Sequence, residues 1–162
     1  MNKNRTICVL LLALTFSSGV VDASPPLIIR PQFGYGFIDS SGPNAGGNLN
    51  HLGMRLLLDA GGNKRYGLEA TEFSPEKGRR FYSVGIALEQ RLWNWFNMSI
   101  GTVGYFDYGA SSENPVGLMT NLGWEPSSYK SLKPFITYRN DLIFGKEVDV
   151  AHSLSAGLSF EF

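Results

Sequence analysis

The feature that most constrains this chain is a strict alternation of apolar and polar residues, which is clearest from His152 to Phe162. After His152, one parity of this stretch is apolar and holds Leu154, Ala156, Leu158, Phe160 and Phe162. The other parity holds serine, glycine and glutamate. Successive side chains of a β-strand point to opposite faces, so a period of two predicts a strand with one apolar and one polar face.

Seven earlier segments alternate in the same way, and polar connections rich in glycine, serine and asparagine separate most of them. The segments run over Leu27 to Ile38, Leu49 to Leu58, Arg65 to Phe73, Arg79 to Leu92, Phe96 to Tyr105, Pro115 to Glu125 and Leu132 to Phe144. The third segment loses the pattern at Glu72 and Phe73. About ten residues is the span of a tilted strand that crosses a membrane. The pattern therefore predicts an all-β chain, an eight-stranded antiparallel up-and-down transmembrane β-barrel.

Alternation alone does not say which parity faces the lumen, because a soluble lipocalin-like barrel alternates with its apolar side inward. The character of the two parities decides the question. The apolar parity is bulky on every strand and includes Trp, Tyr and Phe, as a lipid-facing wall with aromatic girdles requires. The other parity combines small residues with charged ones, and we expect a polar network in the lumen from Arg30, His51, Arg55, Glu69, Glu89, Arg91, Glu125, Arg139, Asp141 and Glu161.

The first residues have the pattern of a secretory signal peptide. Lys3 and Arg5 precede an apolar run from Ile7 to Phe16, and Val21-Asp22-Ala23 is a small-x-small cleavage site. We therefore expect a leader over residues 1–23 and a barrel domain over residues 24–162. Cleavage would remove Cys8, the single cysteine of the chain. The balance of 14 basic and 14 acidic residues gives no indication of a nucleic-acid partner.

The eight alternating segments, the last ending on Phe162, resemble the small eight-stranded outer-membrane β-barrels of bacteria. That group includes the OmpA-like and OmpX-like barrels and the lipid A 3-O-deacylase barrels. The resemblance implies a location in the bacterial outer membrane, with both termini periplasmic and outer-membrane lipid and lipopolysaccharide as partners. It further implies that Phe160 and Phe162 form the signal read by the barrel-assembly machinery. The longer polar connections at residues 39–48, 107–114 and 145–151 would then face outward as contact surfaces.

Two histidines are the candidates for chemistry. His51 could act as a general base with Ser83 or Asp141. His152 with Ser155 resembles the deacylase pair, but that family uses His-x-Ser one strand before the end, where this chain has Tyr138-Arg139-Asn140. The spacing here puts His152 and Ser155 on opposite faces of a strand, so the catalytic residues of that family are not matched. No cluster has metal-ligand spacing, and no cofactor is indicated.

Three basic residues form a candidate lipid contact: Lys77, Arg79 and Arg80 could bind lipopolysaccharide phosphates, or could be an ordinary charged rim. The sequence favours a structural or surface-interaction protein with a side-chain-filled lumen. The alternatives are a lipid A-modifying acyl hydrolase and a narrow pore. Arg55, Phe81, Arg91 and Tyr105 would obstruct such a pore, because eight strands leave little space inside. The sequence indicates no particular oligomeric state.

Overall fold

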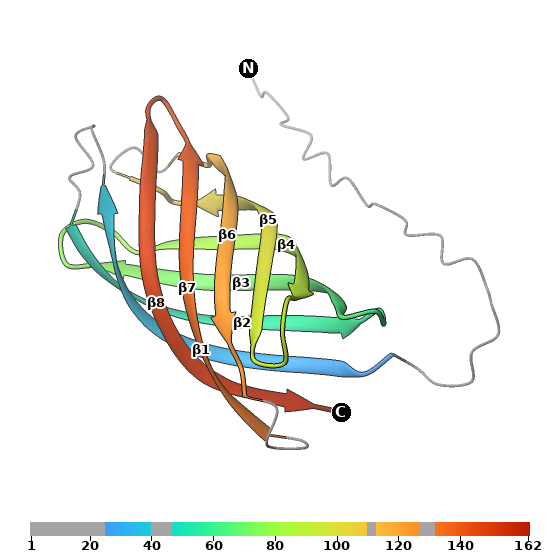
Figure 1. Cartoon of the computed structure of the whole chain (residues 1–162). Coiled ribbons are helices and arrows are strands. Elements are labelled where there is room, and N and C mark those ends of the chain that lie inside the picture. The colour runs from blue at the N-terminus through green and yellow to red at the C-terminus, as the bar shows by residue number, and fades with distance from the viewer. Residues whose placement is uncertain (1–24, 40–46, 110–112, 127–131) are drawn as a thin grey trace.

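The computed structural model describes residues 25–39, 47–109, 113–126 and 132–162, which form one closed sheet with its connections (Figure 1). Each strand pairs antiparallel with its neighbours in the sequence, and β1 pairs with β8 to close the barrel. The strands are β1 (Leu27–Asp39), β2 (Gly47–Asp59), β3 (Lys64–Pro75), β4 (Phe81–Arg91), β5 (Phe96–Phe106), β6 (Val116–Trp124), β7 (Leu132–Phe144) and β8 (Val148–Glu161). The predicted all-β, eight-stranded up-and-down barrel is confirmed.

The up-and-down order gives the barrel two different ends. The turn end carries the β2–β3, β4–β5 and β6–β7 connections, together with the start of β1 and the end of β8. The loop end carries the other four connections. In the β2–β3 turn, Gly61, Gly62 and Asn63 all have positive φ, a conformation open to glycine and tolerated by asparagine. The described residues contain no helix long and apolar enough to span a membrane.

The alternation predicted from the sequence is present on every strand. On β6, for example, each residue from Val116 to Trp124 switches between exposed and buried without exception. The buried parity carries small and charged residues together with some large apolar ones, such as Leu57, Phe73 and Ile143. The other parity is almost entirely apolar and faces outward with substantial exposure. The soluble alternative, with its apolar side inward, is therefore wrong for this chain. A wall of this kind is what a lipid-facing barrel surface requires.

Three strand boundaries at the loop end differ clearly from the prediction, those of β3, β4 and β8. β3 continues to Pro75 without a break: Phe73 is buried in the lumen, and Glu72 lies on the outer wall. The sequence pattern looked interrupted because the lumen becomes apolar there while the outside becomes polar. β8 begins at Val148 instead of His152, so the predicted 145–151 loop shortens to residues 145–147. β4 likewise begins at Phe81, two residues after its predicted start.

A proline interrupts the seam that closes the barrel. The β1–β8 register stops after Ile29↔Phe160 and resumes at Gln32↔Gly157. Pro31 lies in this gap, and it lacks the N–H that a ladder hydrogen bond needs. The β1–β2 pairing continues past Pro31 through Met54. The strand therefore keeps its place in the sheet while the seam is locally weakened.

Candidate functional site

Four charged side chains meet in the lumen toward the turn end and form the turn-end cluster: Arg30, Arg65, Glu89 and Glu125. Arg30 Nη1 donates to Glu89 Oε2 over 2.7 Å, and Arg65 Nη1 donates to Glu89 Oε1 over 2.9 Å. Both arginines also donate to Glu125 Oε2. All four side chains are buried, and their charges cancel. Buried ions need such mutual compensation, because water cannot solvate them.

A second neutral set, the middle cluster, holds Arg55, Glu69, Arg139 and Asp141. Glu69 accepts hydrogen bonds from both Arg55 and Arg139. Arg139 Nε also donates to Asp141 Oδ2 over 2.8 Å. Arg55 Nη2 donates to Asn121 Oδ1 over 2.7 Å, which links the cluster to β6. The two clusters together place side chains from β1, β2, β3, β4 and β7, with Glu125 just after β6, across the inside of the barrel.

Toward the loop end an aromatic cap replaces the ion pairs. Phe73 and Phe81 stack with ring centroids 4.7 Å apart, and Tyr108 meets Phe81 edge-on at 5.0 Å. Tyr108 comes from the β5–β6 connection, and its hydroxyl donates to Asp149 Oδ2 over 2.8 Å. Burial, and then the hydrogen bond with Asp149, raise the pKa of the Tyr108 phenol above its ordinary value. The ring contact with Phe81 and the hydrogen bond to Asp149 together hold Tyr108 inside the loop end of the barrel.

Most of the predicted lumen residues are buried where the sequence placed them, namely Arg30, His51, Arg55, Glu69, Glu89, Glu125, Arg139 and Asp141. Arg91 and Glu161 lie at the turn end and are only half-buried. Glu161 pairs there with Lys133 over 2.8 Å. The sequence reasoning missed Arg65, although Arg65 shares the parity of Glu69 and a strict reading of the alternation would have found it. It also missed Asp149, because that residue was assigned to a loop.

The proposed His51 catalytic pair is not assembled. Within the described residues, neither ring nitrogen of His51 has a hydrogen-bond partner, and neither does Ser83 Oγ. Asp141 is engaged with Arg139. The His51 ring instead lies against Phe73, with centroids 5.6 Å apart, and against the backbone at Gly34. A nucleophile and its base need hydrogen-bond contact, which this arrangement lacks.

The second candidate pair is split across the wall of the barrel, as its spacing predicts. Ser155 is buried in the lumen, where its hydroxyl donates to the carbonyl of Thr137 over 3.4 Å. His152 is on the outer wall, and its Nδ1 hydrogen-bonds with the Tyr138 hydroxyl over 2.8 Å. The described residues also contain no group of three or more His, Cys, Asp or Glu that could hold a metal ion.

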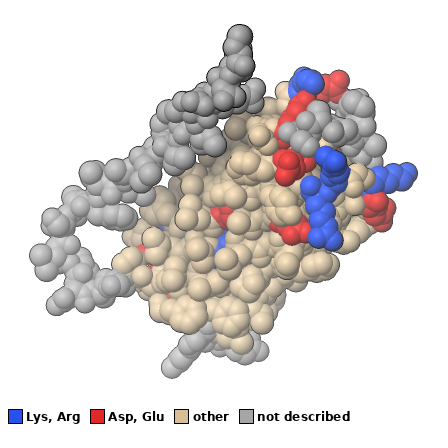
Figure 2. All heavy atoms as spheres, turned by 180° about the vertical axis from the view of Figure 1, so that it is seen from behind, with Lys and Arg blue, Asp and Glu red and all other residues tan. Residues whose placement is uncertain are grey.

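Charged side chains on the outside gather at the loop end, which lies to the right in Figure 2. Lys77, Arg79 and Arg80 are all exposed in the β3–β4 connection. Arg80 pairs with Glu72 over 3.0 Å. Lys146 of the β7–β8 loop pairs with Glu113 over 2.9 Å, and this hydrogen bond raises the pKa of Lys146. These residues form the loop-end rim.

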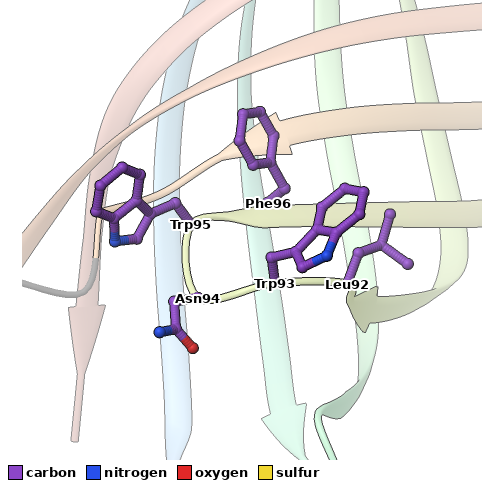
Figure 3. Close-up of a pocket in the computed structure, with 5 residues that line it drawn as sticks. All are labelled: Leu92, Trp93, Asn94, Trp95 and Phe96. Carbon is purple, nitrogen blue, oxygen red and sulfur yellow. The ribbon is translucent and has the colours of Figure 1, made fainter.

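The turn end carries aromatic side chains instead of charges at the β4–β5 connection. Figure 3 shows Leu92, Trp93, Asn94, Trp95 and Phe96 around an open hollow at this turn. Trp93 meets Phe96 edge-on with ring centroids 6.1 Å apart, and both tryptophans are largely exposed. Tryptophan is enriched where a membrane meets water. This turn therefore has the composition of an interfacial girdle.

Comparisons with known proteins find structural but not sequence relatives: no family model and no curated protein matches this chain. It is similar to Neisserial surface protein A, with a TM-score of 0.65 and 15% identity over 84% of this chain and 97% of that chain. It is similar to Ail, the attachment invasion locus protein of Yersinia pestis, with a TM-score of 0.59 and 8% identity over 86% and 100% of the two chains. A de novo designed transmembrane β-barrel matches with a TM-score of 0.52 and 8% identity over 86% and 98%.

These similarities identify the architecture. The chain has the fold of the small eight-stranded outer-membrane β-barrels, as its resemblance to the OmpA-like and OmpX-like group predicted. At such low identities the match extends to the fold alone. Residues 1–24 lie outside the described residues, so the signal peptide stays a prediction. Residues 40–46 and 110–112, parts of two expected contact loops, lie outside them as well.

Proposed function

We propose that this protein is a bacterial outer-membrane barrel with a sealed lumen, whose role is structural or in interactions at the cell surface. The observation that carries the proposal is the division of every strand into two walls. The inner wall holds the paired charges and the aromatic cap, and the outer wall is formed almost entirely by exposed apolar side chains. The fold shared with other outer-membrane barrels supports the same location. In this arrangement the loop end faces outward, and both termini and the short turns face the periplasm.

The side chains that fill the lumen favour a sealed barrel over a narrow pore. The turn-end cluster, the middle cluster and the aromatic cap follow one another along the inside, and an eight-stranded barrel leaves little further space. We expect the protein refolded in detergent to migrate differently before and after boiling, and to give almost no conductance in a planar bilayer. Stable single-channel steps would reject the sealed lumen. A band unchanged by boiling, with helical circular dichroism, would reject the membrane barrel itself.

The orientation can be tested by labelling from outside intact cells. Lys77→Cys lies in the β3–β4 connection at the loop end, and Asn94→Cys lies in the β4–β5 turn. A membrane-impermeant thiol reagent should label the first in intact cells, and the second only after the outer membrane is opened. The opposite result would invert the proposed orientation.

Lipopolysaccharide is the proposed partner of the basic residues at the loop-end rim. Lys77, Arg79 and Arg80 lie exposed on one connection, where an arginine fork can bind phosphate bidentately. We expect the variant with all three changed to alanine to be stabilised less by added lipopolysaccharide in a thermal melt. Lys64→Ala, which removes an exposed lysine at the turn end, is the matched control. Equal stabilisation of both variants would show that Lys77, Arg79 and Arg80 do not bind lipopolysaccharide and are an ordinary charged rim.

The final aromatics support a proposed contact with the barrel-assembly machinery. Phe160 faces outward on β8, and Phe162 follows the strand and is 74% exposed. The backbone of Phe162 hydrogen-bonds with that of Leu27 on β1, so the closing of the sheet at this residue uses backbone atoms while the ring stays mostly exposed. Phe162→Ala should lower the amount of assembled barrel in cells while leaving refolding in detergent unchanged. A variant that assembles at the normal level would exclude this role.

A further inference from the structure

The apolar part of the outer wall differs in height from strand to strand, and it is low on β3. The outward residues of this strand are Lys64, Tyr66, Leu68, Ala70, Glu72 and Ser74. A charged side chain therefore bounds the apolar stretch at each end, Lys64 toward the turn end and Glu72 toward the loop end. We name the outward side of β3 from Lys64 to Glu72 the short face.

The two ends of the short face are built to stay in contact with water. Glu72 pairs with Arg80 over 3.0 Å, and their side chains are 34% and 69% exposed. On the neighbouring strand β2, the exposed Asn50 is the register partner of Ser74, so the wall is polar there across two strands. Lys64 is exposed at the other end. Moving the barrel along the membrane normal cannot lengthen this face, because it would push one of the two charges into hydrocarbon.

The wall formed by β7 and β8 is much taller. On these two strands, which the structure describes completely, no Asp, Glu, Lys or Arg faces outward from Leu132 to Phe144 or from Val148 to Phe160. Asn140 and His152 are polar members of this wall, but neither carries a formal charge at pH 7. We name this wall the tall face. It lies across the barrel from β3, since β7 is four strands away in either direction.

The difference in height is large on the scale of a bilayer. Lys64 and Glu72 are eight residues apart, about 26 Å along a strand, and Leu132 and Phe144 are twelve residues apart, about 40 Å. A strand tilt of about 40° reduces these lengths to about 20 Å and about 30 Å along the membrane normal. The apolar band of an outer-membrane barrel is about 25 Å tall. The short face is therefore lower than the bilayer that it has to match, whereas the tall face is not.

We propose that the short face makes the membrane locally thinner, with the lipid head groups of both leaflets drawn toward Lys64 and Arg80. A bilayer adapts to a short apolar surface by thinning beside it. The phosphate of a lipid head group suits both ends, because it can meet the Lys64 ammonium on the turn side and the Arg80 guanidinium on the loop side. This inference rests on the membrane location proposed above.

Spin labels at two matched positions test the proposal, in a chain that also carries Cys8→Ser. Leu68→Cys lies midway between Lys64 and Glu72, and Leu154→Cys lies midway between Val148 and Phe160; the two leucines are 57% and 58% exposed. Both variants are refolded into vesicles of one phosphatidylcholine. Power saturation with oxygen and with a nickel chelate should place the first label about 10 Å below the head groups and the second about 15 Å below them.

Equal depths of the two labels would overturn the proposal and leave the membrane location intact. A Leu68→Cys label shielded from both oxygen and nickel would also overturn it, because another chain would then cover the short face. Two labels that both lie in water would instead reject the membrane location itself.

Lengthening the short face gives a second test. Lys64→Leu combined with Glu72→Leu removes the charge at each end of the face. Glu76→Leu combined with Lys77→Leu is the matched control, because it removes one acidic and one basic residue from the exposed β3–β4 connection. In phosphatidylcholine vesicles of increasing acyl-chain length, the first variant should reach its highest Tm in a longer lipid than the unchanged protein, and the control should not. An optimum that stays in place, or that moves equally in both variants, would overturn the proposal.

Discussion

Ion pairs inside the barrel and ion pairs at the loop-end rim have similar lengths but very different surroundings. Glu89 and Arg65 lie 2.9 Å apart with side chains 2% and 6% exposed. Glu72 and Arg80 lie 3.0 Å apart with side chains 34% and 69% exposed. When the rim pair breaks, water solvates both charges, whereas the buried pair has no such substitute. Burial, more than the distance between the charges, therefore sets how much the loss of each ion pair lowers the free energy of unfolding.

The largest expected effect comes from Glu89→Ala. Glu89 joins Arg30 and Arg65, so its loss leaves two buried guanidinium groups that share Glu125, with the half-exposed Asp59 a further 4.0 Å contact of Arg65. We expect the free energy of unfolding to fall by about 3–5 kcal/mol, the cost of removing one partner of a buried pair. Urea titration of the protein refolded in lipid vesicles measures it. A loss as small as that of a rim variant would show that water reaches the turn-end cluster.

An intermediate effect is expected from Tyr108→Phe, which keeps the aromatic ring but removes its hydrogen bond to Asp149. Asp149 is 5% exposed, so its carboxylate would lose a buried partner, at a cost of about 1–3 kcal/mol. The β5–β6 connection should also become more sensitive to limited proteolysis. Tyr66→Phe on the outer wall is the control, because Tyr66 is 54% exposed. Equal behaviour of the two variants would mean that Tyr108 does not hold the cap in place.

The smallest effect on stability is expected from Glu72→Ala at the rim. Breaking this exposed pair should change the free energy of unfolding by about 0–1 kcal/mol. Added salt should reduce even that difference, since exposed charges are screened. The same urea titration at two ionic strengths measures both. A loss comparable to that of Glu89→Ala would contradict the role assigned to burial.

No effect on lipid chemistry is expected from either histidine. His51 is buried and has no hydrogen-bonded partner in the part of the chain that the structure describes, and His152 lies on the outer wall away from Ser155. Mass spectrometry of lipid A should therefore give the same acyl pattern in cells with and without the protein. Acyl chains lost in the presence of the protein, and restored by His51→Ala or His152→Ala, would establish the hydrolase that the geometry does not support.

The sequence predicted the barrel and the two walls because a strand obeys one simple rule, the alternation of its side chains. The same rule failed where the walls exchange character: Phe73 inside and Glu72 outside reverse the usual assignment. Val148 to Ala151 alternate as well, but a run of four residues beside a polar loop was too short to be separated from it. Arg65 lies at the start of β3, where alternating neighbours follow on one side only, so the sequence pattern did not assign it to the lumen.

The sequence by itself determined which residues face the lumen, since parity along a strand needs no knowledge of its neighbours. Only the closed barrel decided which of them meet. Arg30 bonds to Glu125, 95 positions away, because the register of eight strands brings both to the same level inside. The partners of Glu69 and Glu89 and the contact of Tyr108 with Asp149 depend on that register. The register is set by pairing and closure between strands, which no single strand encodes.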